Sequence, residues 1–249
     1  MDLAGLHRGA LIAGRFALEA QVSWGVKGTL LRARDRETGA LVALRVLPAE
    51  PGAVELGRME QDLEALRTLG HPGIATPLGH GRLEQGQLFM AAEWVEGESL
   101  RHRLARRPLS AGESLEVLRQ AATALGQAHR LGVVHRALRP SSLLIEGGGA
   151  GAGLGRVRVV DFGMQPAGLS FQTISGSSEL VGAMQYMAPE QGRGEQQIGP
   201  GADVFALGCV LFECATGQPV FQGNHAMSVL AKILLQEPPR VSELVSHVS

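Results

Sequence analysis

The chain has 249 residues, a formal net charge of −1 and 45% hydrophobic residues, as is typical of a globular protein with a full core. A charge so close to zero gives no electrostatic reason to expect a nucleic acid as partner. The longest apolar run, 204–214, is too short to span a bilayer, and no apolar segment follows Met1. We therefore expect no membrane segment within the chain and a cytoplasmic location, either free or as the cytosolic part of a larger protein.

The first hundred residues predict a β-rich unit with one helix. Five strands are predicted from alternating apolar positions between turn signals, over 16–18, 28–34, 41–47, 75–79 and 87–94. Apolar residues at helical spacing predict a helix over 54–69, which ends at Gly70. Gly97 then breaks the pattern, and we interpret this position as a hinge.

The remainder predicts a mainly helical unit. Ser110 and Glu113 form a capping-box pattern at the start of a helix that runs to His129. Further elements are predicted as strands at 143–145 and 157–160 and as helices at 202–216 and 226–235. Residues 164–187, rich in Ser, Gly and Gln, are predicted to be one long loop. The order of elements predicts an α+β fold of two lobes, with a ligand cleft between them.

Two cysteines, Cys209 and Cys214, lie five residues apart in the predicted helix 202–216. That spacing places them on different helix faces, so we expect two buried thiols and no disulfide or metal site.

Five motifs in a fixed order resemble the signatures of protein kinases. They are a Gly-rich segment at Ser23–Gly28, Val42–Arg45, the catalytic-loop segment His135–Ser142, Asp161–Gly163 and Ala188–Glu190. The residues that make up the motifs are most similar to those of bacterial Ser/Thr kinases.

The resemblance covers about residues 12–245 and implies a two-lobed protein kinase fold. It implies an N-terminal extension at 1–11, a kinase N-lobe at 12–96 and a kinase C-lobe at 97–249, which together make one protein kinase domain. The family's domain continues with further helices, so we expect the C-lobe to be incomplete at its C-terminal end.

The resemblance also implies ATP and Mg²⁺ as ligands in the cleft. In such kinases a Gly-rich loop brings backbone N–H groups to the phosphates, and a carboxylate at the position of Asp161 holds Mg²⁺. The residues implied for nucleotide binding are Ser23, Gly25, Gly28, Leu30, Ala43, Arg45, Glu93, Val95, Leu144 and Asp161.

Arg45 stands where the family has the lysine that contacts phosphates and pairs with a glutamate of the following helix. The spacing puts Asp62 at the partner's position. Because the longer side chain of Arg and the shorter side chain of Asp partly compensate for each other, we predict a structural Arg45–Asp62 ion pair. Arg is nevertheless not equivalent to Lys at a tight phosphate site. Lys27 in the Gly-rich segment is either a substitute lysine or a solvated loop residue.

The catalytic loop departs most from the family. Ala137 replaces the Asp that orients the substrate hydroxyl and accepts its proton, a loss that typically costs about 10²–10⁴-fold. Arg139 replaces the loop lysine and remains a candidate phosphate contact. Ser142 replaces the Asn that binds a second Mg²⁺ and is a weaker ligand. Ala183 replaces the Thr that ties the substrate-binding segment to the absent Asp.

Other positions match the family and imply structural or regulatory roles. His135, Phe162 and Leu66 are expected to stack in an apolar column, and Asp203 to act as a buried structural carboxylate. Arg136 matches the arginine that pairs with a phosphorylated activation loop. The serine-rich loop is therefore either a phosphorylation switch or a solvated loop.

Taken together, the substitutions favour a pseudokinase that acts on a protein partner, a neighbouring domain or another kinase, as a regulatory or scaffolding module. The alternative is a weakly active Ser/Thr kinase that uses Arg45, Arg139 and Asp161, because positioning and charge supply much of the acceleration. A third hypothesis is a sensor in which ATP only stabilises the fold.

Overall fold

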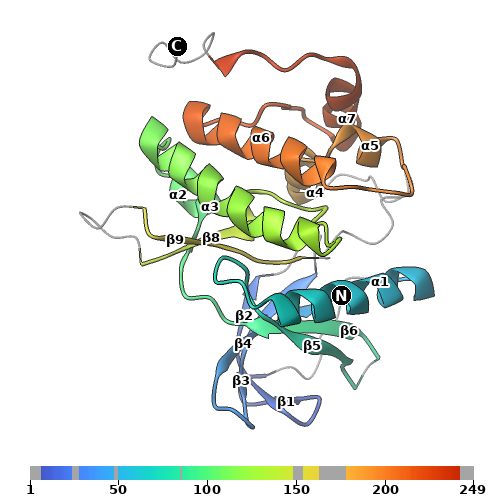
Figure 1. Ribbon diagram of the computed structural model, residues 1–249. Coiled ribbons are helices and arrows are strands. Elements are labelled where there is room, and N and C mark those ends of the chain that lie inside the picture. The colour runs from blue at the N-terminus through green and yellow to red at the C-terminus, as the bar shows by residue number, and fades with distance from the viewer. Residues whose placement is uncertain are drawn as a thin grey trace.

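The computed structural model of the chain describes residues 7–23, 28–47, 50–84, 86–147, 154–162 and 178–241. Strands β1–β6 and helix α1 lie at one end of the molecule and form the N-lobe, while the long helices α3 and α6 lie at the other end, in the C-lobe (Figure 1). The strands β7, β8 and β9 of the C-lobe lie between these two groups. The two lobes predicted from the sequence are therefore present.

The N-lobe is a six-stranded antiparallel sheet in the order β1-β2-β3-β4-β6-β5, with α1 beside it. Its strands are β1 (Leu11–Ile12), β2 (Phe16–Ser23), β3 (Thr29–Asp35), β4 (Leu41–Val46), β5 (Pro77–Arg82) and β6 (Leu88–Glu93). In β4, Val42, Leu44 and Val46 are fully buried and alternate with partly exposed residues. Because side chains alternate across a strand, one face of the sheet makes the core of the N-lobe and the other faces the second lobe.

Helix α1 (Ala53–Leu69) is the one helix predicted in this half of the chain, and it ends where expected. Gly70 has a left-handed conformation with φ of 53°, and its N–H donates to the carbonyl of Leu66. A residue without a Cβ meets this requirement at least cost. Leu66 is buried among the apolar residues of the C-lobe, so α1 packs against both lobes.

The C-lobe is organised around α3 and α6, which pack against each other. Its elements are β7 (Glu98–Ser99), α2 (Leu100–Leu104), α3 (Ala111–Arg130), the 3₁₀ helix η1 (Pro140–Ser142), β8 (Leu143–Glu146), β9 (Arg156–Val159), α4 (Ser178–Met184), α5 (Pro189–Gly192), α6 (Gly201–Thr216) and α7 (Ala226–Leu235). The predicted capping box is confirmed: Ser110 accepts from the N–H of Glu113, whose side chain accepts from the N–H of Ser110.

The prediction of one loop over 164–187 was wrong for its end. Residues 178–184 form helix α4, which buries Leu180 and Met184 on one side. Their spacing of four residues is helical, but the Ser-rich composition before them concealed it. Residues 163–177 lie outside the described part of the chain.

The two lobes are joined by backbone contacts as well as by the chain. The N–H of Ala75 donates to the carbonyl of Val159, and the N–H of Val159 donates to the carbonyl of Gly73. At the predicted hinge, a Cβ on Gly97 would lie 2.7 Å from the carbonyl oxygen of Ile145 in β8. Only a glycine allows the hinge to run so close to the floor of the cleft.

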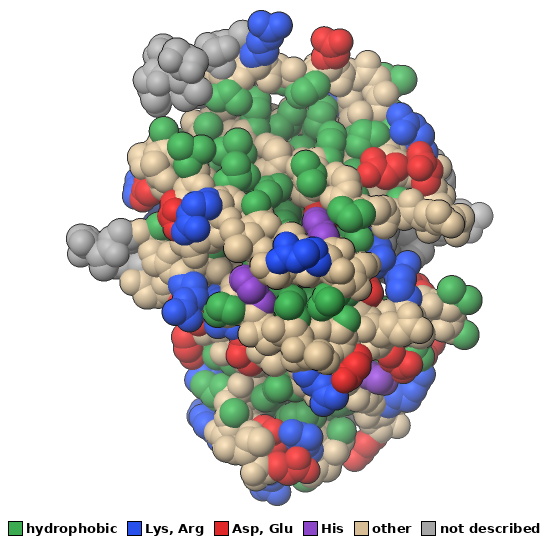
Figure 2. Space-filling view, in the orientation of Figure 1, with side chains coloured by type: hydrophobic (Ala, Val, Ile, Leu, Met, Phe, Trp, Pro, Cys, Tyr) green, Lys and Arg blue, Asp and Glu red, His purple; other side chains and the backbone are tan. Residues whose placement is uncertain are grey.

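The surface differs between the lobes. Charged side chains of both signs are interspersed over the N-lobe, whereas hydrophobic side chains are frequent over the helical lobe (Figure 2). Val204 of α6 and Leu235 of α7 are among the exposed ones. Cys209 and Cys214 are buried free thiols, as predicted, and burial raises the pKa of each to about 12. No helix in the described ranges is long and apolar enough to cross a membrane.

Candidate functional site

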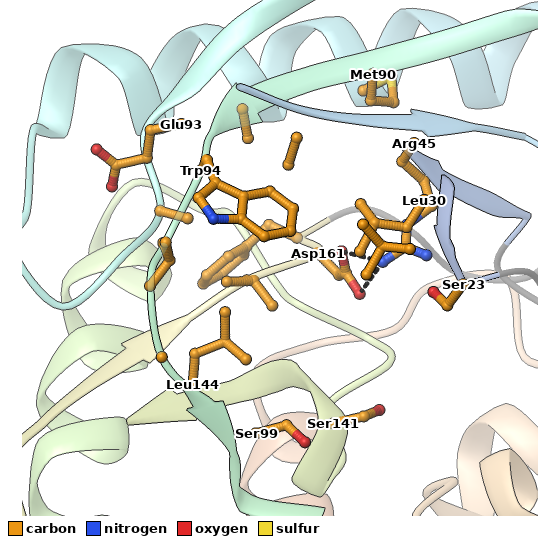
Figure 3. A pocket seen from close by; sticks show the side chains of 18 of the residues that line it. Ser23, Leu30, Arg45, Met90, Glu93, Trp94, Ser99, Ser141, Leu144 and Asp161 are labelled. Atoms are coloured by element: carbon orange, nitrogen blue, oxygen red, sulfur yellow. Dashed lines mark hydrogen bonds and ion pairs between the residues drawn. The ribbon is translucent and has the colours of Figure 1, made fainter. Parts of the chain in front are cut away.

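A cavity of about 600 Å³ lies between the lobes. The sheet of the N-lobe contributes Leu30 and Arg45, the hinge contributes Trp94, and the C-lobe contributes Leu144 and Asp161 (Figure 3). Cavities of this size that are mainly apolar and contain a few convergent polar groups are typical of small-molecule sites.

The alternation of the strands explains which residues of the sheet reach the cavity. In β4 the odd-numbered residues Ala43 and Arg45 lie on the face opposite the buried core residues. Leu30 of β3 pairs directly with Arg45 across the ladder, so it lies on the same face. Leu30, Ala43 and Arg45, which the resemblance implied for nucleotide binding, therefore lie on one face of the sheet, and all three line the cavity.

The hinge presents backbone groups to the cavity. Val95 is 7% exposed and lines the cavity, and its backbone N–H and C=O make no hydrogen bond with any other described residue. The side chain of Glu93 points away from the cavity (Figure 3), accepts from the N–H of Thr76 and pairs with Arg158. Glu93 therefore offers the cavity its backbone, while its carboxylate has a structural role.

The predicted Arg45–Asp62 ion pair does not form. The Nη2 atom of Arg45 lies 3.0 Å from each carboxylate oxygen of Asp161, across the cleft. The two side chains are only 13% and 15% exposed, so the pair is largely removed from water. The prediction failed because it paired two residues within the N-lobe and did not consider that the longer Arg reaches the opposite lobe.

Asp62 instead pairs with Arg136, whose Nη1 lies 3.1 Å from Oδ2 of Asp62. Burial raises the pKa of Asp62, and the nearby Arg136 opposes that shift. The guanidinium of Arg136, which the sequence suggested as a partner for a phosphorylated residue, is thus engaged with α1.

Asp203 of α6 holds the catalytic-loop segment in place, as expected for a structural carboxylate. It is fully buried and accepts hydrogen bonds from the backbone N–H groups of His135 and Arg136, both at 2.8 Å, and lies 2.7 Å from Nε2 of His129. Burial favours a higher pKa for Asp203, but these hydrogen bonds hold its pKa below the ordinary value. Arg136 has a φ of 61° here, a conformation that costs energy for a residue with a Cβ.

The expected apolar column is also present. The rings of His135 and Phe162 lie 4.7 Å apart. Nδ1 of His135 accepts from the N–H of Ala137 at 3.2 Å, and Nε2 lies 2.9 Å from the carbonyl oxygen of Val160. A ring that accepts at Nδ1 and faces a carbonyl with Nε2 carries its proton on Nε2.

The degenerate positions of the catalytic loop contribute little to the cavity. Ala137 and Ser142 are not among the residues that line it. Ser142 is fully buried, and its hydroxyl donates to the carbonyl of Ala137 at 3.4 Å. Its predicted role as a weak magnesium ligand is therefore not supported by its position. Arg139 does line the cavity and is 9% exposed.

The described residues do not fit a magnesium ion. Mg²⁺ is usually held by one or two carboxylates together with substrate phosphates. Asp161 is the candidate, but both of its oxygens already accept from Arg45, and its φ of 65° fixes it in a left-handed conformation.

The described residues do fit a nucleotide. Leu30 and Ala43 above and Leu144 below form an apolar slot, and the backbone of Val95 has the donor and acceptor that a purine edge needs. At the other end Nε of Arg45 is buried and has no hydrogen-bond partner among the described residues. An unsatisfied cationic N–H is suited to a phosphate oxygen.

Some of the residues predicted for the site lie within the described part of the chain, and others do not. Ser23 and Gly28 line the cavity, the latter with a φ of 89°. Gly25 and Lys27 lie outside the described residues. Ala183 lies in α4, half-buried, so it belongs to a helix and not to the predicted loop.

Some of the residues that line the cavity were not predicted. Ser99, which caps α2, and Arg101 in α2 both line the cavity with Ser141. The Ser99 cap pattern could have located the start of α2, but no local signal places it beside the cleft or predicts the contact between Arg136 and Asp62, which are 74 residues apart.

A two-lobed fold with a nucleotide-sized cleft at its hinge defines a protein kinase domain, and a model of the protein kinase domain family matches residues 16–246. The chain belongs to this family and is of the bacterial Ser/Thr type.

Among the curated relatives, the serine/threonine-protein kinase pkn3 of Myxococcus xanthus is 33% identical over 239 residues, which cover 93% of this chain and 43% of that protein. PknA of Mycobacterium tuberculosis is 32% identical over 240 residues, which cover 93% of this chain and 53% of that protein. This chain thus spans about half the length of these relatives.

The fold resembles the crystal structure of the Mycobacterium tuberculosis PknI kinase domain with a TM-score of 0.72. The two sequences are 23% identical, and the match covers 96% of this chain and 84% of that chain. The predicted two-lobed kinase fold is thereby confirmed.

Proposed function

We propose that this kinase domain is a pseudokinase that acts through a protein partner as a regulatory or scaffolding module, with a nucleotide as a structural ligand. The observation that carries the proposal is Ala137, which places a methyl group where the family resemblance expects the carboxylate that accepts the substrate proton. A methyl group can neither orient a hydroxyl nor take its proton.

The geometry around Ala137 supports the same reading. Its backbone N–H donates to His135, and its carbonyl accepts from the buried Ser142, so the loop is held by its own internal contacts. Arg45, which replaces the phosphate-binding lysine, is engaged with Asp161. The carboxylate that accepts the substrate proton and the phosphate-binding lysine are thus replaced, and the carboxylate of Asp161 is held in an ion pair; phosphoryl transfer requires all three groups.

A weakly active Ser/Thr kinase is the second candidate, and two observations favour it. Arg139 lines the cavity close to the catalytic loop, and relatives such as PknA are named as serine/threonine-protein kinases. Charge and positioning alone retain part of the acceleration in enzymes that lack a base.

Phosphate transfer measured with labelled ATP distinguishes the two candidates. The chain is incubated with a general protein substrate and Mg²⁺, beside Asp161→Ala as the matched variant. We expect no difference between the two proteins. Slow autophosphorylation that disappears in Asp161→Ala would establish the weak kinase instead.

A further inference from the structure

The wall of the cavity is richer in arginine than in carboxylate. Among the described residues that line it, three are arginines, Arg45, Arg101 and Arg139, and two carry carboxylates, Glu93 and Asp161. The carboxylate of Glu93 points away and pairs with Arg158, which is not part of the lining. The described lining therefore carries more positive than negative charge, and Arg45 supplies part of it at the end opposite the hinge (Figure 3).

Among the described residues, one carboxylate points into the cavity, and a guanidinium neutralises it. Nη2 of Arg45 lies 3.0 Å from both oxygens of Asp161, and the two side chains are only 13% and 15% exposed. A divalent cation at Asp161 would either share the carboxylate with Arg45, which sets two positive groups beside one negative charge, or displace Arg45 and leave a largely buried guanidinium without this charge partner. Such displacement is costly at a site with little water.

The same arginine has an unused donor. Its Nε is buried and makes no hydrogen bond with any described residue, while Nη2 holds Asp161. A buried, unpaired N–H of a charged group costs free energy until an acceptor arrives. Phosphate oxygens are such acceptors, and guanidinium groups bind them with strong, charge-assisted hydrogen bonds.

We propose that the cavity binds a nucleoside di- or triphosphate without a divalent cation, with Arg45 and Arg139 in place of the metal. The purine lies between Leu30 and Leu144 against the hinge, and the phosphates extend toward the arginines. The inference rests on the proposed function only in taking the nucleotide as a structural ligand.

Calorimetric titration of the chain with ATP, once with Mg²⁺ and once with a chelator, tests this proposal. We expect dissociation constants that agree within about threefold, because no ligand of the protein prefers the metal complex. A loss of affinity of more than about tenfold in chelator overturns the proposal, because it shows that the metal carries the binding.

Two substitutions test the roles of Asp161 and Arg45, and the first changes ATP affinity in opposite directions for a metal-free and a metal-dependent site. Asp161→Asn removes a negative charge and frees Arg45, so affinity for ATP should stay equal or rise, whereas a magnesium site would lose affinity. Arg45→Gln should weaken ATP binding by about tenfold or more in both conditions, since a charge-assisted hydrogen bond is lost. Unfolding cannot produce a rise in affinity, so the first variant remains informative even if the second is unstable.

The control is Arg107→Gln, which removes an exposed arginine that pairs with Glu113 and does not line the cavity. Its affinity for ATP should equal that of the unmodified chain. Failure to bind ATP in both conditions also overturns this inference and the structural role of the nucleotide, but it leaves the proposed inactivity and the role as a protein-binding module standing. Phosphate transfer, measured separately, would overturn the pseudokinase proposal without bearing on the metal.

Discussion

The guanidinium of Arg136 lies 3.1 Å from the carboxylate of Asp62, and this contact joins the catalytic-loop segment of one lobe to the helix α1 of the other. Both side chains are about nine-tenths buried. Because burial raises the pKa of Asp62 even beside Arg136, the pair fixes the relative position of the elements more than it adds to total stability.

A double-mutant cycle of Asp62→Ala and Arg136→Ala should therefore give a coupling energy of about 1–3 kcal/mol in urea unfolding. The matched control is Glu64 with Arg67, an exposed pair on the same helix, whose coupling should be about 0.5 kcal/mol or less. Equal couplings in the two cycles would show that the interlobe pair has no special role.

Asp203 gives a prediction on pH. Its hydrogen bonds lower its pKa from the ordinary 3.8 despite burial, so its ionised form stabilises the fold. That contribution is present above the ordinary pKa and is lost as pH falls through the lower folded value.

Asp203→Asn should lower the free energy of unfolding by about 3 kcal/mol at neutral pH. The gap to the unmodified chain should close as pH falls below about 4, in urea unfolding at a series of pH values. The control Glu64→Gln changes an exposed carboxylate. A gap that stays constant down to low pH would contradict the assigned role of the ionised carboxylate.

For Glu213 of α6 the predicted pH dependence of stability has the opposite sign. Burial raises its pKa above the ordinary 4.5, although the hydroxyl of Tyr186 donates to it and Arg101 lies near. A raised folded pKa means that the protonated form is favoured by folding. The corresponding stability is present below 4.5 and is lost as pH rises through the folded value.

Glu213→Gln should thus keep the acceptor for Tyr186 while removing the buried charge. We expect its thermal midpoint at pH 7 to equal or exceed that of the unmodified chain, and the difference to disappear toward pH 4. Tyr186→Phe, which removes the donor, should lower the midpoint at pH 7, with a loss of about 1–3 kcal/mol. A lower midpoint for Glu213→Gln at neutral pH would show that the charge itself stabilises α6.

The catalytic defect should be repairable only in part. Ala137→Asp restores a carboxylate at the position of the base, yet Arg45 remains paired with Asp161. We expect phosphate transfer to stay at background in that variant and to rise only when it is combined with Arg45→Lys. The rise attributable to a restored base has an upper range of about 10²–10⁴-fold. Full recovery with Ala137→Asp alone would mean that the ion pair opens freely.

At the hinge, Gly97→Ala should destabilise the chain by about 1–3 kcal/mol, since its Cβ would lie 2.7 Å from the backbone oxygen of Ile145. Gly126→Ala in α3, where a Cβ meets no atom within 4 Å, is the control and should raise stability slightly. Thermal unfolding of both variants would reveal whether the close approach constrains the hinge.

The elements and the cavity-facing side of the sheet could be predicted because they follow from local rules. Alternation in β4 places Ala43 and Arg45 on one face, and the capping box places the start of α3 within a residue. Such patterns depend on neighbours within a few positions, which one sequence displays.

The partners of the charged residues could not be predicted in the same way. Arg45 and Asp161 are 116 residues apart, and the choice between Asp62 and Asp161 depends on how the lobes approach each other. The length of the arginine side chain permits both contacts, so only the packed structure decides between them. The helix α4 was missed for a different reason, because the helical spacing of Leu180 and Met184 follows a Ser-rich segment that predicts a loop.

Arg45 and Asp62 both belong to the N-lobe, and each forms an ion pair with a residue of the C-lobe. Their partners are Asp161 and Arg136, respectively. Together with the hinge and the backbone hydrogen bonds between Val159 and the N-lobe, these two ion pairs attach the lobes at several points, so the cleft can open widely only when several of these contacts break. For a molecule inside, residence time is then set by how often the lobes separate.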